Sequence, residues 1–410
     1  MKSKNLHDLI SDVYQDILKY VVGSEAKPRA GIVEVLREIK SNYAVILSAP
    51  PGYGKTMIPY CLGYFSCARS DLWPLRTIHV LPLRSIIEDC FNKLFRGEKE
   101  PKIPLLTKEV VARQTMDEAG SPWLQRRLIF TTLDTFTMCA VRLPPAELQK
   151  IARTVSMGHG LLSKSAILSS TIVFDEVHLF VEEGGKMASV FSALLWWLRT
   201  FLTPLVIMSA TLPTEVEKFL RERLGNRIRI LRYGVDFTDE KFDEERRMAM
   251  EQLVTEKPRT GDIRDIVKEA CIAKECYNRV LVVLNTVKRC IEVAKALESL
   301  GLKPIVLHSK IASIQRSDRL CQLKGDEWLA VATQVVEAGV DISSQYLITD
   351  GAPPCALVQR AGRLLRWKKD IGLEGKMITF VDKKAIESEV YHGIYNTCLL
   401  YTSPSPRDRG

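Results

Sequence analysis

The 410-residue sequence predicts an α/β protein with two tandem units, each a parallel sheet covered by helices. Three observations lead to this prediction. Short apolar runs recur in both halves of the chain, helical stretches lie between these runs, and a charged segment with few strand candidates separates the halves. At about 150 residues per domain, the length allows two or three units.

The apolar runs give the expected strands. In the first half they lie at residues 43–49, 76–82, 127–132, 171–177 and 204–211, with helices expected over 1–40, 83–97 and 186–201. In the second half they lie at 279–285, 304–309, 328–333, 346–351 and 377–382. We therefore expect a first unit at 1–228, a polar connector at 229–265, a second unit at 266–395 and a tail at 396–410. The tail contains Ser-Pro-Ser-Pro, which indicates either a disordered terminus or non-native sequence.

Composition places the chain among globular proteins. Hydrophobic residues make up 46%, and 58 Lys+Arg against 49 Asp+Glu leave a net charge of +9. This surplus suits a polyanionic partner, although basic proteins also exist for reasons of solubility. The ten cysteines contain no C-x-x-C pair, and no secretory or membrane-spanning segment is expected. The sequence therefore predicts a cytoplasmic protein without a zinc site or a membrane partner.

A phosphate-binding loop is the first chemical motif. The stretch APPGYGKT contains Pro51, Gly52, Tyr53, Gly54, Lys55 and Thr56 between an apolar run and a helix. Small residues let backbone N–H groups turn toward phosphate oxygens, the lysine reaches the β- and γ-phosphates, and the hydroxyl binds magnesium. The strict pattern has glycine where this chain has Ala49. The motif predicts ATP binding with Mg²⁺.

Paired carboxylates form the second motif, VFDEVH. Asp175 and Glu176 follow an apolar run, so that the two side chains can take different roles. Asp175 would hold Mg²⁺ together with Thr56, and Glu176 would polarise the attacking water. His178 would reach toward the second unit. An acidic pair at a strand end is often only solvated, but its position after a phosphate-binding loop favours a catalytic role.

Clustered arginines form the third motif, QRAGRLLR at residues 359–366. A solvated basic helix face is the usual explanation of such a run. Here Arg363 and Arg366 have the spacing of one helical face, and Gly362 leaves room beside them. The pattern predicts that both arginines approach the γ-phosphate of ATP from the second unit.

GYGKT, DEVH, SATLP (209–213) and QRAGRLLR, in this order, resemble the superfamily 2 helicases of the DExH kind, which contain two tandem RecA-like domains. The segments LNTVKR (284–289) and TQVVEAGVDIS (333–343) resemble the CRISPR-associated helicases of type I systems. The resemblance extends over roughly residues 29–385. It implies a DNA helicase or translocase that acts on single-stranded DNA with a CRISPR surveillance complex.

The resemblance also implies roles for individual residues. Catalysis would involve Lys55, Asp175, Glu176, Arg363 and Arg366. Further ATP contacts would come from Pro51, Gly52, Tyr53, Gly54, Thr56, Gly339, Asp341 and Gln359. Coupling of nucleotide state to motion would involve His178, Ser209, Ala210 and Thr211. Nucleic-acid contacts would come from Arg84, Thr132, Asn285, His308 and Thr333, although Thr132 and Asn285 are equally consistent with strand-end caps and Arg84 with a helix-start cation.

Three departures from the family pattern set further expectations. Many relatives carry a glutamine near the position of Gly31 that contacts the adenine edge, and this sequence has none. Arg29 could stack on the base, but a solvated arginine at the start of a helix is the better interpretation. The pair His7–Asp8 has no companion ligands, whereas a nuclease metal centre needs several converging His and Asp side chains. A separate HD nuclease would therefore cut the DNA strand. Little sequence follows residue 382, which suggests a truncated chain. RNA is not excluded as the substrate. A DNA-repair or RNA-directed helicase and an ATP-gated clamp without unwinding remain alternatives.

Overall fold

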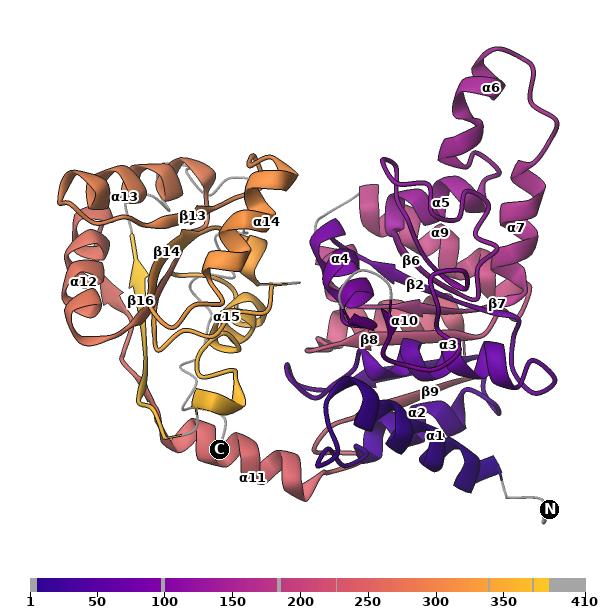
Figure 1. The fold of residues 1–410 in the computed structure, drawn as a ribbon, viewed down its shortest axis with the longest axis horizontal. Coiled ribbons are helices and arrows are strands. Elements are labelled where there is room, and N and C mark those ends of the chain that lie inside the picture. Colours follow the sequence, from indigo (N-terminus) through magenta and orange to yellow (C-terminus); the bar gives the residue numbers. More distant parts are fainter. Residues whose placement is uncertain are drawn as a thin grey trace. The chain divides into compact units, whose positions relative to one another are not determined.

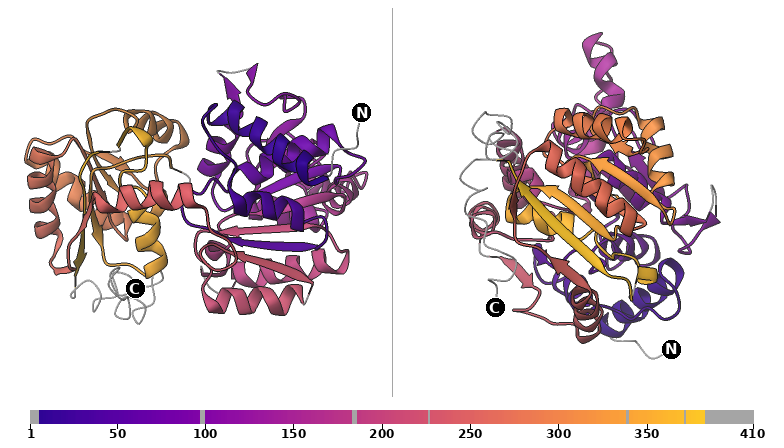
Figure 2. Two further views of the ribbon diagram at one scale, coloured as in Figure 1. Left: turned by 90° about the horizontal axis from the view of Figure 1, so that it is seen from below. Right: turned by 90° about the vertical axis from the view of Figure 1, so that its left-hand side faces the viewer.

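The computed structural model describes residues 6–96, 100–182, 186–225, 227–337, 340–370 and 372–382. The chain divides into two compact units, Met1–Glu240 and Lys241–Gly410 (Figure 1). Each unit contains a parallel sheet with helices on both faces (Figure 2). The predicted fold class is therefore confirmed.

The first sheet is built from seven parallel strands in the order β5-β6-β2-β7-β8-β1-β9. Their registers pair Val45 with Val206 and Ile172 with Leu205, which places β1, β8 and β7 side by side. The strands are β1 (Ala44–Ser48), β2 (Arg76–Leu81), β5 (Val111–Gln114), β6 (Leu128–Thr132), β7 (Ser170–Phe174), β8 (Leu205–Ser209) and β9 (Ile228–Arg232). A separate antiparallel pair is formed by β3 (Phe95–Arg96) and β4 (Glu100–Pro101).

Helices cover both faces of this sheet because its strands are apolar on both sides. One face buries Ile46, Ile78 and Phe174 against the later helices. These are α5 (Leu133–Ala140), α7 (Gly160–Leu168), α8 (His178–Glu182), α9 (Lys186–Thr200) and α10 (Thr214–Leu224). The other helices of this unit are α1 (Leu6–Val21), α2 (Ala30–Glu38), α3 (Met57–Ala68), α4 (Arg84–Asn92) and α6 (Leu148–Ala152), with a short 3-10 turn at Pro145–Glu147.

The second sheet is parallel throughout and has the order β10-β16-β15-β12-β14-β13, with β11 also pairing with β16. Its strands are β10 (Leu253–Thr255), β11 (Arg259–Thr260), β12 (Arg279–Val283), β13 (Ile305–Leu307), β14 (Trp328–Ala332), β15 (Tyr346–Asp350) and β16 (Gly375–Val381). The helices are α11 (Glu240–Glu251), α12 (Ile263–Cys276), α13 (Val287–Ser299), α14 (Ser313–Gln322) and α15 (Pro354–Ala361), with 3-10 turns at Gln334–Val336 and Lys368–Asp370. Separate apolar cores lie on its two faces.

The segment expected as a polar connector, 229–265, contains elements of both units. Strand β9 extends to Arg232 and pairs with β1, whereas β10 and β11 pair with β16. These strands are short or rich in charge, so their apolar signal in the sequence is weak. The predicted tail, 396–410, lies outside the described residues. None of the described helices is both long and apolar enough to cross a membrane.

Candidate active site

The carboxyl ends of β1, β8 and β7 bring the first two motifs together. All strands of the sheet are parallel, so their carboxyl ends lie at one edge, and these three strands are neighbours. The phosphate-binding loop follows β1, Asp175 follows β7, and Ser209 ends β8. Ligands of open α/β sheets bind at this edge.

The loop between β1 and α3 has the backbone of a phosphate cradle. Gly52 and Gly54 have φ angles of +81° and +93°, in the left-handed region that favours glycine. A Cβ atom at Gly52 would meet no atom within 4 Å, so the φ angle and not crowding is what favours glycine there. Lys55 is 8% exposed and its Nζ donates to the Ala49 carbonyl at 2.9 Å. Thr56 directly precedes α3, whose N-terminal end favours anions. These features fit a bound triphosphate.

Tyr53 has its side chain in the core of the first unit. Its hydroxyl accepts a hydrogen bond from the Gly31 N–H at 2.9 Å, and its ring packs against Tyr233 and Phe237 at 5.5 and 5.8 Å between centroids. A Cβ atom at Gly31 would lie 2.3 Å from the Phe237 ring, so a glutamine would not fit there. Arg29 pairs with Asp239 at 3.1 Å. This packing accounts for the missing glutamine at Gly31 and attaches the loop to α2.

The two carboxylates have different surroundings. Asp175 is 7% exposed, and its Oδ1 accepts the Glu176 N–H at 3.0 Å. Burial acts to raise the pKa of Asp175, but His79 and the charge of Lys55 outweigh it and lower that pKa below its ordinary value. Glu176 has a φ of +49°, a strained conformation often found at functional sites, and its Oε2 accepts the Ala210 N–H at 3.3 Å. Asp175 is therefore suited to hold a cation, while Glu176 points toward the SATLP motif.

His178 connects the DEVH and SATLP motifs. The His178 Nδ1 lies 2.9 Å from the Ser209 Oγ, and this hydroxyl donates to the Thr211 carbonyl at 2.6 Å. His178 is 3% exposed, and these contacts lie within the first unit. Glu176 and His178 therefore both contact the segment 209–211 directly.

The arginine motif of the second unit differs from its expected geometry. Helix α15 ends at Ala361 with Gly362 as its C-cap, so the prediction that Arg363 and Arg366 share a helical face is wrong. Arg363 is buried and donates to the carbonyls of Val336 and Glu337 at 2.7 and 2.6 Å. Glycine is a weak helix former, and here it ends the helix.

Other predicted ATP contacts of the second unit surround this turn. Arg366 is 29% exposed and pairs with Asp341 at 3.2 Å. Gln359 is 8% exposed, and its Nε2 has no hydrogen-bond partner among the described residues. A buried N–H group without an acceptor lowers the stability of the fold unless a ligand accepts its hydrogen bond. Gly339 lies outside the described residues.

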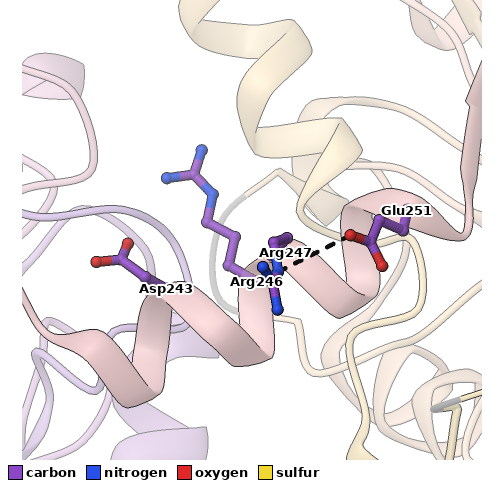
Figure 3. A pocket seen from close by; sticks show the side chains of 4 residues that line it. All are labelled: Asp243, Arg246, Arg247 and Glu251. Carbon is purple, nitrogen blue, oxygen red and sulfur yellow. Dashed lines mark ion pairs between the residues drawn. The ribbon is translucent and has the colours of Figure 1, made fainter.

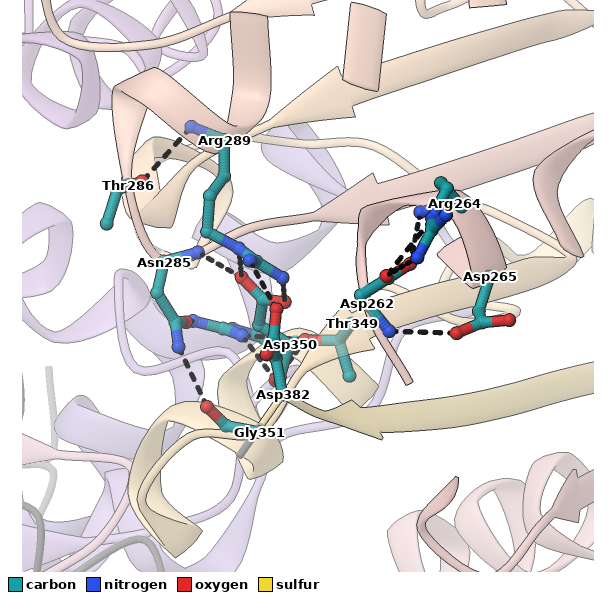
Figure 4. A network of polar contacts seen from close by, with 11 residues as sticks. Asp262, Arg264, Asp265, Asn285, Thr286, Arg289, Thr349, Asp350, Gly351 and Asp382 are labelled. Atoms are coloured by element: carbon teal, nitrogen blue, oxygen red, sulfur yellow. Dashed lines mark hydrogen bonds and ion pairs between the residues drawn. The ribbon is translucent and has the colours of Figure 1, made fainter. Parts of the chain in front are cut away.

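A buried polar network beneath the motif was missed at the level of sequence. Arg360 is fully buried and bonds Glu337 at 2.7 Å, the Thr349 hydroxyl at 2.6 Å and the Asn285 Oδ1 at 2.9 Å. Next to it, Arg289 pairs with Asp350 at 2.9 Å and with Asp382 at 2.8 Å (Figure 4). Arg360, the first arginine of QRAGRLLR, is therefore neutralised inside the protein, without an external anion.

The five predicted nucleic-acid contacts lie at or shortly after the carboxyl ends of β2, β6, β12, β13 and β14. Two are exposed or half-buried: Arg84 pairs with Asp117, and the Nδ1 of His308 accepts the Lys310 N–H at 3.3 Å. Three are buried: Thr132 caps α5, Thr333 precedes a 3-10 turn, and Asn285 donates to the Gly351 carbonyl at 2.8 Å. Thr132 thus has the capping role that the sequence left open, whereas Asn285 binds the chain after β15 and the cap of α13 is Thr286.

Replacing Thr132 with alanine tests its role as a cap. The Oγ1 of Thr132 accepts the Thr135 N–H, so Thr132→Ala should lower the free energy of unfolding by about 1 kcal/mol. Thr132→Ser keeps the hydroxyl and should retain most of that stability. Urea titrations of both variants measure the difference. Equal stability of the two variants would contradict the capping role.

A hollow of about 410 Å³ beside α11 does not extend this site (Figure 3). Its lining residues, Asp243, Arg246, Arg247 and Glu251, all come from this one helix. Arg247 pairs with Glu251 at 3.8 Å, and both side chains are about 70% exposed. This surface has the character of a solvated helix face. Among the described residues, no cluster of three or more His, Cys, Asp or Glu side chains could hold a metal ion.

Comparison with known proteins assigns both units. Residues 33–219 match the DEAD/DEAH box helicase family, and residues 276–369 match the C-terminal region of the CRISPR-associated nuclease/helicase Cas3 family. Both matched regions are thus similar to superfamily 2 helicases, and the second is similar to the CRISPR-associated Cas3 proteins in particular. These matches confirm the predicted resemblance, and the DEAD/DEAH match indicates an ATP-dependent helicase region in the first unit.

Two curated relatives illustrate the Cas3 match. A Cas3 helicase of Thermoproteus tenax is 25% identical over 344 residues, which is 80% of this chain and 54% of the relative. A Cas3 nuclease/helicase of Myxococcus xanthus is 31% identical over 224 residues, which is 52% of this chain and 27% of the relative. The chain thus spans between about a quarter and a half of the curated Cas3 relatives it matches.

Solved structures share the fold of the chain. T. fusca Cas3 with AMPPNP has a TM-score of 0.59 at 16% identity and covers 89% of this chain and 47% of its own. S. cerevisiae Dbp5 bound to RNA and ADP BeF3 has a TM-score of 0.64 at 17% identity, and the match covers 92% of this chain and 91% of the Dbp5 chain. At these identities the likeness concerns the fold alone, which is that of tandem RecA-like units.

Proposed function

We propose that this chain is an ATP-driven motor that moves along single-stranded DNA and unwinds duplex DNA in type I CRISPR interference. The observation that carries the proposal is the convergence of Lys55, Asp175 and Glu176 at one sheet edge, with Glu176 joined to Ala210. A binding module has no need of a strained second carboxylate beside an ionised one. A hydrolytic enzyme uses the first for the metal and the second for water.

In this proposal each residue of the site has a defined task. Lys55 and the loop N–H groups bind the phosphates, and Thr56 and Asp175 hold the magnesium ion. When bound, magnesium neutralises charge that develops on the phosphate oxygens. Glu176 orients the attacking water, and Ser209, Ala210 and Thr211 respond to the position of Glu176. Of the two predicted arginines, Arg366 remains partly exposed beside Asp341 and is the one we propose to contact the phosphates, with Gln359 as a further candidate, whereas Arg363 is engaged by backbone carbonyls.

The proposed partners follow from the relatives. One structure with a similar fold is a CRISPR RNA-guided surveillance complex before nicking, with a TM-score of 0.58. The Thermoproteus tenax relative is named a helicase, whereas the Myxococcus xanthus relative is named a nuclease/helicase. We propose that this chain acts with a surveillance complex and that a separate HD nuclease cuts the displaced strand.

Strand-displacement assays with DNA and RNA duplexes test the substrate. Single-stranded DNA should stimulate ATP hydrolysis, and duplex DNA with a single-stranded overhang should be unwound. Stimulation by RNA alone would contradict the CRISPR role and favour an RNA-directed helicase. ATP hydrolysis without displacement would favour a clamp.

DNA repair is a further alternative because UvrABC system protein B of Thermotoga neapolitana is 29% identical over 146 residues, 32% of this chain.

Glu176→Gln separates nucleotide binding from hydrolysis. The amide keeps the size of the side chain but cannot polarise water as a carboxylate does, so hydrolysis should fall by about 100-fold or more. Binding of a fluorescent ATP analogue should stay within about twofold, because the phosphate-binding loop is unchanged. Glu215→Gln, on the exposed first turn of α10, is a matched control that should retain full activity. Hydrolysis by Glu176→Gln at the wild-type rate would refute the catalytic assignment.

A further inference from the structure

His79 is a buried histidine directly beside the proposed magnesium ligand. It lies on β2 with no exposed surface, and its register partner on β7 is Val173. Side chains alternate along a strand, so His79 and Asp175 point to the same face of the sheet. The Asp175 N–H donates to the Val80 carbonyl at 3.0 Å, which keeps this end of β7 against β2.

The contact between the two side chains is close but incomplete. The His79 Nε2 lies 3.4 Å from the Asp175 Oδ2, and the geometry falls short of a hydrogen bond. Neither ring nitrogen of His79 has a hydrogen-bond partner among the described residues. The ring packs against Phe130 at 5.6 Å between centroids. An orphan imidazole costs free energy that an apolar side chain of similar size would avoid.

A buried histidine without hydrogen-bond partners among the described residues, such as His79, calls for an explanation, and the neighbouring carboxylate of Asp175 offers one. A carboxylate has about four lone-pair positions, and one hydrogen bond from behind leaves the others free for a cation. Asp175 already accepts the Glu176 N–H through Oδ1. A donor at Oδ2 would therefore fix the second oxygen and with it the rotation of the carboxylate.

We propose that His79 is a positioning residue that sets the orientation of Asp175 for magnesium binding, through a hydrogen bond from Nε2–H to Oδ2. A shift of a few tenths of an ångström on nucleotide binding closes the 3.4 Å gap. Groups that hold a metal-binding side chain in this way typically change metal affinity by about 10- to 100-fold. This inference rests on the proposed function, because it takes Asp175 as the magnesium ligand.

Three substitutions of His79 separate positioning from core filling. The readout is the affinity for fluorescent mant-ADP with magnesium and with EDTA, and the ratio of the two gives the contribution of the metal. His79→Leu fills the space without a donor and should reduce that ratio at least about tenfold. His79→Gln carries an amide N–H near the place of Nε2 and should restore it. His79→Asn, whose amide corresponds to Nδ1, should behave as His79→Leu does.

Thermal unfolding of each variant distinguishes misfolding from loss of position. His79→Leu should unfold at or above the wild-type temperature, because it removes an orphan polar group. The inference is overturned if His79→Leu retains the magnesium contribution, or if His79→Gln loses it while remaining folded. Asp175→Asn tests the proposed function separately. If magnesium still strengthens mant-ADP binding in Asp175→Asn, the assignment of Asp175 itself is wrong.

Discussion

Replacing Lys55 with alanine is expected to lower the rate of ATP hydrolysis about 1000-fold. The Lys55 side chain is almost fully buried in the loop between β1 and α3. Its ammonium group has only one partner in the first unit, the Ala49 carbonyl at 2.9 Å, among the contacts of the described residues. A phosphate oxygen carries a negative charge and the carbonyl does not, so the ammonium group would bind a phosphate more strongly than it binds this carbonyl.

Steady-state ATPase assays in the presence of single-stranded DNA measure this loss, and strand displacement should fail in parallel. Lys93→Ala is a suitable control because Lys93 pairs with Asp89 on the surface of α4, where such pairs contribute little. It should retain full activity and stability. ATP hydrolysis by Lys55→Ala within about tenfold of wild type would contradict the phosphate-binding role.

Arg360→Ala is expected to destabilise the second unit by about 3–5 kcal/mol, the largest effect on folding that we anticipate. Arg360 is fully buried and joins β12, β15 and the turn at Glu337 through hydrogen bonds of 2.6 to 3.1 Å. Truncation would leave Glu337, Asn285 and Thr349 without their guanidinium partner. Buried polar groups left in this way carry their full desolvation cost.

Hydrogen exchange of the β12 and β15 amides measures this change, because a two-unit protein need not unfold in one step. The control is Arg264→Ala, in which an arginine that is 90% exposed loses its pair with Asp262. That variant should stay within about 0.5 kcal/mol of wild type. If Arg360→Ala is equally mild while ATP hydrolysis is lost, then Arg360 would act on the nucleotide rather than on the fold.

The candidate residues of the ATP site could be named from the sequence because each motif is local. Residues 49–56 and 175–178 each follow an apolar strand, and parallel strands deliver their carboxyl ends to one edge regardless of the distance between them in sequence. The boundaries of the two units were harder to predict from the sequence. Short charged strands such as β11 are recognised only by their pairing with β16, a long-range contact that has no local signature.

Residue types and spacing alone therefore determined the fold class, the phosphate-binding loop and the two catalytic carboxylate candidates. Tertiary structure decided which arginines are available. Arg360 is neutralised by Glu337, Arg363 is bound to backbone carbonyls, and Arg366 remains partly exposed beside Asp341. It also revealed His79, an ordinary residue within an apolar strand until the register of β2 and β7 places it against Asp175. Local sequence encodes strands and turns, whereas the partners of a buried polar group come from distant segments and exist only once the sheet has formed.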